Sequence, residues 1–564
     1  MDYSKLLAQA IADAAGLAAE DIASWIEVPA DEALGDYAFP CFKLAKTLRK
    51  APPAIAAEIG GRLAKPDFIS EVRVVGAYIN FFLDRVTLAK QALADVSGQG
   101  DSYGGSGKGA GRVVCIDYSS INIAKPFHIG HLSTTVIGNA LYRIYGFLGY
   151  KPVGINHLGD WGTQFGKLIV AYKLWGSKED IEARSITAML ELYVKFHEEA
   201  EKDPALDEQA REWFKKIEDG DEEALSIFNW FKELTLKEVG KIYELLGVHF
   251  DSYAGESFYN DKMQPVIDEL KEKGLLEFSE GAYVVRLGDD LPPCIVLKSD
   301  GATLYSTRDL AAAFYRKQTY DFHKCLYVVA YQQNLHFRQV FKVIELMGYD
   351  WAKDLEHVAF GMVSLEDGTL STRKGKVVLL KDVLDKAVEK TLSIIEEKSP
   401  GLENREEVAK TVGIGAVVFD TLSSARIKDI TFSFDRVLNF DGETGPYVQY
   451  THARCASLLR RADFDWAAAD KDYTALDNAE AFATAKLLHS FPDAVARACE
   501  KNEPYLITRH IIEIAKAMNR FYYEHRIINE DEAKTAARLM LAACVKQVLK
   551  TGLYLIGVGA PDRM

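Results

Sequence analysis

The sequence predicts a multidomain α/β protein built around a parallel, doubly wound sheet. Its 564 residues correspond to about three or four domains of average size. Between residues 112 and 156 a buried strand pattern, a helix pattern and a second strand pattern follow one another, which is how such a sheet begins. From about Glu406 onward nearly all of the chain has a helical pattern, which predicts an all-α C-terminal part.

Residues 1–107 are expected to form an N-terminal α/β domain followed by a glycine-rich linker. Tyr3 to Leu17 has the periodicity of an amphipathic helix, and a second helix pattern begins near Pro53. Residues 72–83 are rich in the β-branched and aromatic side chains that strands prefer. Seven of the fourteen residues from 98 to 111 are glycine, which is typical of a flexible connection.

The same glycines superficially resemble a phosphate-binding P-loop, so a P-loop NTPase is one alternative. That motif needs a lysine followed by Ser or Thr, placed between a strand and a helix. Here Lys108 is followed by Gly109, and a strand pattern comes after the glycines. The pattern therefore favours a linker.

The parallel-sheet domain is expected to cover residues 108–365, with insertions at about 178–290. A helix pattern from about His131 to Phe147 separates its first two strand patterns, and further sheet-like patterns appear near residues 294–297 and 324–330. Residues 366–405 are expected to connect this domain to a helical domain of residues 406–564.

The acidic composition excludes one class of function. The formal net charge is -15, whereas a nonspecific DNA-binding protein is normally basic. Nine of the excess negative charges fall within residues 178–224, which we expect to be an exposed helical insertion, and residues 501–564 carry a net charge of +3. Promiscuous nucleic-acid binding is therefore excluded, but a shape-selective nucleic-acid surface is not.

The cysteine and hydropathy patterns predict a protein of the reducing cytoplasm that does not bind to membranes. The seven cysteines form no CxxC pair and their number is odd, which supports neither a disulfide framework nor a structural metal site. No apolar run reaches 18 residues, and the acidic residues near the N-terminus do not fit a secretory signal.

The most informative stretch is the His-Ile-Gly-His box of residues 128–131. It lies between the first strand pattern and the first helix pattern, at the sheet edge where ligands bind. A helix N-terminus offers N–H groups to phosphate, Gly130 allows close approach of the backbone, and His128 and His131 can donate hydrogen bonds to an α-phosphate. The alternatives are two histidines bonded locally at a helix start, or metal ligands that lack a third partner.

The box and its surroundings resemble the arginyl-tRNA synthetases, a family of class I aminoacyl-tRNA synthetases. The sequence before it reads Asp-Tyr-Ser-Ser-Ile-Asn-Ile-Ala-Lys-Pro. The resemblance begins at Gly35 and covers nearly the whole chain, and several motifs in order are more specific than one alone. The other matching segments are residues 156–166, 305–309, 332–337 and 442–454.

The resemblance implies a set of arginine-binding residues. A guanidinium is permanently charged and presents a planar fork of donors, so carboxylates can pair with it and an aromatic ring can stack on it. Glu256 is a further candidate on a shorter match. The expected set is Asp117, Asn122, Tyr305, Asp309 and Gln333.

The second class I signature departs from its usual Lys-Met-Ser-Lys-Ser form. The matching stretch, residues 369–375, keeps only Ser371 in place, and its basic residues come later, at Arg373 and Lys374. By resemblance, Ser371 and Lys374 act in catalysis, and we hypothesise that Lys125 shares the neutralisation of pyrophosphate. The residues expected to meet the adenine through their backbone are Gly361, Met362 and Val363.

The resemblance also implies the reaction. A Rossmann-like catalytic domain would activate L-arginine with ATP, with Mg²⁺ carried on the nucleotide, and transfer the arginyl group to the 2′-hydroxyl of the terminal adenosine of tRNA(Arg). Bound tRNA would be required for efficient adenylate formation. The expected protein is a cytoplasmic monomer.

Both terminal domains are expected to contact tRNA. The N-terminal domain resembles the additional domain that binds the tRNA elbow, although residues 37–40 depart from the family pattern. In the C-terminal anticodon-binding domain, Tyr447 and Tyr450 would stack on anticodon bases, and Met564 would end the chain near the anticodon.

Two alternatives remain open at this point. Another class I synthetase, such as the cysteine enzyme, would be expected to carry a zinc-binding cysteine site. A non-catalytic tRNA-binding paralogue is disfavoured by the intact His-Ile-Gly-His box.

Replacing Lys125 by Ala is expected to lower arginine-dependent ATP–pyrophosphate exchange by at least about tenfold, because a charge contact made in the transition state would be lost. The measurement is the exchange rate at saturating ATP and arginine. An unchanged rate would refute a role for Lys125 in neutralising pyrophosphate.

Overall fold

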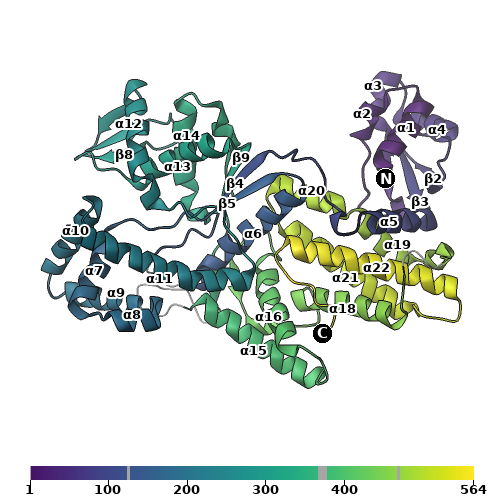
Figure 1. Ribbon diagram of the computed structural model, residues 1–564. Helices are drawn as coiled ribbons and strands as arrows, with labels where there is room; N and C mark the ends of the chain where they lie inside the picture. The colour runs from purple at the N-terminus through teal and green to yellow at the C-terminus, as the bar shows by residue number, and fades with distance from the viewer. Residues whose placement is uncertain (1, 124–126, 366–377, 466–469) are drawn as a thin grey trace. The chain divides into compact units, whose positions relative to one another are not determined.

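The computed structural model describes residues 2–123, 127–365, 378–465 and 470–564 (Figure 1). The chain divides into two compact units. Unit 1 comprises Met1–Tyr103, Arg454–Phe491 and Glu513–Val548, and unit 2 comprises Gly104–Ala453, Pro492–Ile512 and Leu549–Met564. The units group segments by compactness, so the domain boundaries predicted above stay predictions.

Unit 1 contains a three-stranded antiparallel sheet in the order β1-β3-β2, with β1 at Tyr37–Pro40, β2 at Ile69–Val75 and β3 at Tyr78–Leu83. The predicted strand region is therefore a hairpin, which turns at Gly76 with φ +60°. The predicted first helix is confirmed as α1 (Tyr3–Ala15), which ends where Gly16 adopts a left-handed conformation.

Helices pack against this sheet and extend unit 1. The core brings together apolar side chains of α1, α4 and β3. Lys486 of α19 forms an ion pair of 2.7 Å with the nearly buried Asp36, which precedes β1. The remaining helices of the N-terminal segment and α19 are α2 (Ala19–Ala23), α3 (Ala45–Leu48), α4 (Pro52–Arg62), α5 (Arg85–Gln99) and α19 (Ala479–His489).

The centre of unit 2 is a four-stranded parallel sheet in the order β10-β9-β4-β5. β4 lies at the point where the strand order reverses, because its neighbours are β5, which follows it, and β9, which comes much later in the chain. Ligands of such sheets bind beyond the carboxyl ends of the strands at this point. The strands are β4 (Val113–Asp117), β5 (Lys151–Ile155), β9 (Lys324–Tyr327) and β10 (Leu355–His357).

Three helices connect and cover this sheet: α6 (Leu132–Phe147), α13 (Tyr305–Tyr320) and α14 (Asn334–Leu346). The predicted strand–helix–strand unit is thus confirmed as β4, α6 and β5. α13 and α14 contribute apolar side chains to the core on the sheet, together with α12.

A large insertion separates β5 from α13. Figure 1 shows α7 to α10 gathered around the long helix α11. The acidic segment predicted to be helical is confirmed as α8, α9 and α10. The helices are α7 (Thr163–Trp175), α8 (Lys178–Arg184), α9 (Ile186–Ala200), α10 (Ala205–Glu218), α11 (Glu222–Leu246) and α12 (Met263–Glu272).

The insertion ends in a separate antiparallel sheet of β6 (Leu276–Ser279), β7 (Ala282–Val285) and β8 (Cys294–Lys298). The strand predicted near residues 294–297 belongs to this sheet rather than to the central one.

The rest of the described chain is mainly helical, as predicted. One exception is the parallel pair β11 (Val363–Leu365) and β12 (Ile430–Phe432). The helices are α15 (Leu380–Lys398), α16 (Arg405–Thr421), α17 (Phe434–Val437), α18 (Gly445–Arg461), α20 (Phe491–Lys501), α21 (Tyr505–Glu524) and α22 (Glu532–Leu555).

The glycine-rich segment is held against the turn after α6, which differs from the flexible connection expected. Gly109 N–H donates to Leu148 O at 2.8 Å, and Gly111 N–H donates to Gly149 O at 2.9 Å. A Cβ atom at Gly109 would lie 2.1 Å from Tyr150 N. The glycines therefore permit close contact between two backbone segments, which composition alone does not reveal.

Substitution of Gly138 in α6 would test how closely this helix packs against Tyr118, the residue that follows β4. A Cβ atom at Gly138 would lie 2.2 Å from the Tyr118 ring, whereas one at Gly146 of the same helix would make only ordinary contacts. Gly138→Ala is expected to lower the free energy of unfolding by about 1–3 kcal/mol through overpacking. Gly146→Ala, the matched control, is expected to raise it by up to about 1 kcal/mol.

The measurement is denaturant unfolding of both variants and the parent protein. Equal effects of the two substitutions would contradict the close packing of α6 on Tyr118.

Candidate active site

The His-Ile-Gly-His box forms the 3-10 turn Ile129–His131 that opens α6 beyond the carboxyl end of β4. Gly130 N–H donates to His128 Nδ1 at 3.0 Å, and His128 N–H donates to His131 Nδ1 at 3.3 Å. A neutral imidazole whose Nδ1 accepts a hydrogen bond carries its proton on Nε2. Both rings therefore hold the tautomer that can donate from Nε2 to an anion.

The segment that follows residues 366–377 is bonded to the box. Ile129 N–H donates to Val378 O at 3.2 Å, and Leu380 N–H donates to Phe127 O at 2.9 Å. This backbone pairing joins the start of α15 to the turn that carries the histidines. Three predicted site residues lie outside the described residues: Lys125, Ser371 and Lys374.

Asp117 already has a cationic partner within the chain. It ends β4, and its Oδ2 lies 2.7 Å from Nη2 of Arg316 on α13, while its Oδ1 accepts a hydrogen bond of 2.8 Å from Ser120. The Arg316 side chain is 1% exposed, and its Cζ lies 5.2 Å from the centre of the Tyr327 ring. Asp117, which was predicted to bind the substrate, is thus largely neutralised by the buried guanidinium of Arg316. This partner was not predicted from the sequence.

The loop after Asp117 has a constrained backbone. Ser119 and Ser120 have φ angles of +70° and +29°, a region that L-residues rarely adopt. Ser119 is buried and its hydroxyl lies 2.8 Å from the hydroxyls of Thr135 and Tyr243. Such strain gathers at functional sites, where the surrounding structure holds it in place.

Asp309 and Tyr305, both predicted, lie on one face of α13 because Asp309 follows Tyr305 by four positions. His336 Nε2 lies 2.6 Å from Asp309 Oδ2, and the Tyr305 ring centre lies 4.6 Å from that of His336. Burial alone would raise the pKa of Asp309, but the hydrogen bond and positive charge of His336 lower it below its usual range. Asp309 is therefore ionised. His336 belongs to a matching segment of the sequence but was not singled out as a site residue.

Glu256 adds a second, partly buried carboxylate. It opens the 3-10 turn Glu256–Lys262, and its Oε2 lies 3.8 Å from Nη1 of Arg308. Burial, opposed by Arg308 and reinforced by the negative charges of Asp309 and Asp160, raises the pKa of Glu256 to about 7. Burial is the main cause of this shift, and a cation bound beside Glu256 would favour its ionised form.

Asn122 and Gln333 have different settings. Asn122 pairs with Gly159 in a parallel bridge, and a Cβ atom at Gly159 would lie 2.3 Å from Asn122 Oδ1, so the 156–166 motif fixes this residue. Gln333 is exposed and ends the 3-10 turn Tyr331–Gln333.

The predicted adenine-binding segment uses its backbone groups within the chain. Gly361 N–H donates to Arg426 O at 2.8 Å, Met362 N–H donates to Asp429 Oδ1 at 2.7 Å, and Met362 O accepts from Ile430 N–H at 2.8 Å. Val363 belongs to β11. A role in holding adenine stays a prediction for these three residues.

The predicted anticodon-binding tyrosines lie on α18. Tyr450 is exposed and Tyr447 is half-buried. Gln449 Nε2 donates to Gly559 O at 2.8 Å, and His452 Nδ1 donates to Pro561 O at 3.0 Å. The last residues of the chain, which end at the half-buried Met564, therefore follow this helix.

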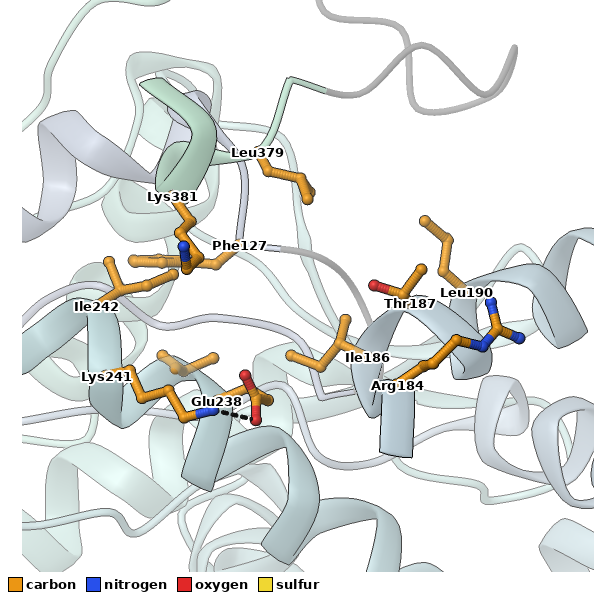
Figure 2. A pocket seen from close by; sticks show the side chains of 11 residues that line it. Phe127, Arg184, Ile186, Thr187, Leu190, Glu238, Lys241, Ile242, Leu379 and Lys381 are labelled. Atoms are coloured by element: carbon orange, nitrogen blue, oxygen red, sulfur yellow. Dashed lines mark hydrogen bonds and ion pairs between the residues drawn. The ribbon is translucent and has the colours of Figure 1, made fainter. Parts of the chain in front are cut away.

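A separate cavity of about 250 Å³ lies beside the box (Figure 2). α9, α11 and the start of α15 enclose it, and Phe127, whose ring centre lies 5.3 Å from that of His131, forms one wall. Its cations have partners of their own: Arg184 pairs with Asp180 and Glu191, Lys241 with Glu238, and Lys381 with Asp385. None of the predicted site residues that the structure describes lines this cavity.

Within the described ranges, no group of three or more His, Cys, Asp or Glu side chains is arranged to hold a metal ion. Among the helices of that part of the chain, none has the length and apolar character needed to cross a membrane.

Three family models match the chain. A model described as tRNA synthetases class I (R), catalytic domain, matches residues 96–434. One described as DALR anticodon binding domain matches residues 448–564, and one described as Arginyl tRNA synthetase N terminal domain matches residues 1–83.

Curated relatives match along the full length. The chain is 57% identical over 551 residues to the arginine–tRNA ligase of Alkaliphilus metalliredigens, covering 97% of each chain. It is 53% identical over 560 residues to the arginine–tRNA ligase of Halothermothrix orenii, covering 99% of this chain and 98% of the other. These matches favour an arginine enzyme over another class I synthetase.

Solved structures share the fold. The arginyl-tRNA synthetase of Thermus thermophilus superposes with a TM-score of 0.83 at 27% identity, covering 99% of each chain. That of Plasmodium falciparum superposes with a TM-score of 0.78 at 23% identity, covering 96% of this chain and 94% of the other. The second similarity is one of fold alone.

The buried pair of Asp117 and Arg316 leads to a stability prediction. Asp117→Asn leaves the Arg316 charge buried without its counter-ion and is expected to cost about 3–5 kcal/mol of unfolding free energy. The double substitution Asp117→Asn with Arg316→Gln is expected to cost less, because no unpaired charge remains.

Asp321→Asn is the control, since it breaks the exposed pair between Lys317 of the same helix and Asp321, which caps its C-terminus, and it is expected to cost about 0–1 kcal/mol. The measurement is chemical denaturation of all three variants. A loss for Asp117→Asn as small as that of the control would contradict a tightly buried pair.

Proposed function

The chain belongs to the arginyl-tRNA synthetase family of class I aminoacyl-tRNA synthetases, and from this premise we propose how its residues perform the reaction. The overall reaction is the ATP-dependent ligation of L-arginine to tRNA(Arg), with release of AMP and pyrophosphate. The observation that carries the residue assignments is the position of the His box, which opens α6 beyond the carboxyl end of β4, the strand at which the order of the sheet reverses. Glu256 and Asp309 interact electrostatically with each other, and Asp309 lies 3.9 Å from His157, which follows β5.

In the first step, the carboxylate of arginine attacks the α-phosphorus of ATP in line and expels pyrophosphate. The protein contributes position and electrostatic stabilisation rather than a nucleophile of its own. His128 and His131 donate from Nε2 to the α-phosphate, a role supported by the hydrogen bonds that their Nδ1 atoms accept. The N–H groups at the start of α6, with Gly130, add to this anion site.

The phosphates that leave need further positive charge. We assign this charge to Lys125 and Lys374, and a further catalytic role to Ser371. The bonding of Val378 and Leu380 to the turn of the His box supports the assignment, because it joins the segment that follows the signature loop to the box. Mg²⁺ would be carried by the ATP phosphates rather than by side chains of the protein, and it would neutralise part of their negative charge. Gly361, Met362 and Val363 meet the adenine.

Arginine is recognised by charge and shape together. Asp309 is ionised and Glu256 is partly exposed, so the guanidinium pairs with these two carboxylates and Tyr305 covers it. Asp117 contributes less charge to the ligand, because Arg316 already neutralises it. Asn122 and Gln333 bind the end of arginine that carries its α-amino and α-carboxylate groups.

In the second step, the 2′-hydroxyl of the terminal adenosine of tRNA(Arg) attacks the arginyl-adenylate. Residues 1–107 contact the tRNA elbow, and residues 406–564 bind the anticodon, with Tyr447 and Tyr450 stacking on its bases beside Met564. The exposure of Tyr450 supports this assignment. The protein acts as a cytoplasmic monomer.

The test is amino-acid-dependent ATP–pyrophosphate exchange with each of the twenty amino acids, with and without tRNA. Exchange is expected with arginine alone and is expected to depend on tRNA. A site built on buried polar pairs should discriminate against an unmatched amino acid by about four orders of magnitude. Exchange with another amino acid would contradict the arginine assignment, and no exchange under any condition would favour a non-catalytic paralogue.

A further inference from the structure

Asp160 is a fully buried carboxylate that faces the turn before α12. Its side chain is 0% exposed. Its Oδ1 accepts a hydrogen bond of 2.8 Å from Ser257 N–H, and its Oδ2 accepts one of 2.7 Å from the Ser257 hydroxyl. The two oxygens of Asp160 therefore hold Ser257 through its backbone and its side chain at once.

Glu256 is fixed by the same segment of chain. Its N–H donates to Leu158 O at 2.9 Å. On its other side, a Cβ atom at Gly255 would lie 2.7 Å from both Asp160 Oδ1 and Leu158 O, so only glycine fits there. Each of the residues 255–257 thus contacts Leu158 or Asp160, and Glu256 is the central residue of this contact.

The charge of Asp160 is balanced by Lys232, whose Nζ lies 2.5 Å from Asp160 Oδ2. Lys232 lies on α11, in the insertion, and its side chain is 26% exposed, so it reaches from the surface inward. A buried carboxylate that loses a cationic partner is strongly destabilised. The connection therefore links α11 to the turn that carries Glu256.

We propose that Asp160 is a positioning residue for arginine recognition, which holds Glu256 toward the guanidinium, and that Lys232 secures it from α11. This inference rests on the proposed function, because it requires Glu256 to bind the substrate. It assigns a role to the acidic residue of the 156–166 motif and to one residue of the insertion, neither of which contacts the substrate.

The charged groups that face Glu256 come from three parts of the fold: Arg308 and Asp309 of α13, Asp160 of the 156–166 motif, and Lys232 of α11 behind Asp160. His157 and His336 lie next, against Asp309. Asp160 helps to raise the pKa of Glu256 to about 7. Removing its charge should therefore lower that pKa as well as loosen the turn.

The experiment compares Asp160→Asn, Lys232→Met and Ser257→Ala with the parent protein in arginine-dependent ATP–pyrophosphate exchange with tRNA present. Asp160→Asn is expected to raise the KM for arginine by at least about tenfold, the loss of one charge-assisted contact, and to change the KM for ATP by less than about twofold. Lys232→Met and Ser257→Ala are expected to raise the KM for arginine by smaller factors, because each removes one of the bonds of Asp160.

A series of KM measurements from pH 5.5 to 8.5 adds a second test. A general loss of structural rigidity would not be expected to shift the pH at which the KM for arginine changes. The dependence of the KM for arginine on pH is expected to reflect the ionisation of Glu256, with tighter binding above about pH 7 in the parent protein. In Asp160→Asn the inflection is expected to move to lower pH, because a neighbouring negative charge has been removed.

Asp251→Asn is the control. Asp251 is exposed, unlike Asp160, but its Oδ2 also accepts a backbone hydrogen bond, from Gly154 N–H of β5 at 2.7 Å. In the described part of the chain it forms no hydrogen bond or ion pair with residues 255–257. This variant is expected to leave the KM for arginine within about twofold of the parent, the range expected when no substrate contact is lost.

An unchanged KM for arginine in Asp160→Asn, or an equal rise in the KM for arginine and for ATP, would overturn the proposal. If Asp160→Asn does not fold, Ser257→Ala and Lys232→Met decide it by the same criterion. A parent protein that fails to activate arginine would instead overturn the proposed function, so the two failures are distinguishable.

Discussion

The buried ion pair between Asp117 and Arg316 is the interaction around which the catalytic centre is arranged. It joins the carboxyl end of the central strand β4 to α13, and Arg316 also contacts the Tyr327 ring of β9. Because Arg316 neutralises Asp117, the negative charge that a ligand encounters comes mainly from three other carboxylates, those of Asp309, Asp160 and Glu256. Asp309 and Asp160 have close partners in His336 and Lys232, whereas the cation nearest Glu256 stands at 3.8 Å. Of these four acids, Glu256 is the one most open to an added cation.

The sequence predicted the parts of this centre that depend on local order. The strand, helix and strand around the His box follow from hydrophobic patterns, and Tyr305 and Asp309 share a helix face because they are four positions apart. Arg316 lies 199 residues from Asp117, so no spacing in the sequence relates them. His336 reaches Asp309 only because α14 packs beside α13.

The insertion has a solvated acidic face and a face that contacts the rest of the catalytic unit. The net charge of the segment does not distinguish the two. Many of its acidic residues pair with cations one turn away, such as Asp180 with Arg184 and Asp219 with Lys215, which fits a solvated outer face. Its long helix α11 differs, because Lys232 reaches a buried carboxylate. Four other residues of this helix line the cavity beside the His box: Glu238, Val239, Lys241 and Ile242. Composition was an incomplete guide for the glycine-rich segment as well. Its glycines indicated a flexible connection, but they did not indicate which backbone segment it packs against.

The way α18 holds the end of the chain has a consequence for how that end can vary. Gln449 and His452 are buried and bind the carbonyl oxygens of Gly559 and Pro561. Carbonyl groups are common to every residue type, so these two hydrogen bonds fix the path of the backbone and do not by themselves select the side chains of the tail. That selection comes from other contacts: a Cβ atom at Gly559 would lie 2.6 Å from Thr411 Cγ2, and Asp562 and Arg563 pair with His452 and Glu403 at 4.0 and 3.8 Å. Exchange of Asp562 or Arg563 is therefore expected to change the surface charge of the tail without changing its path.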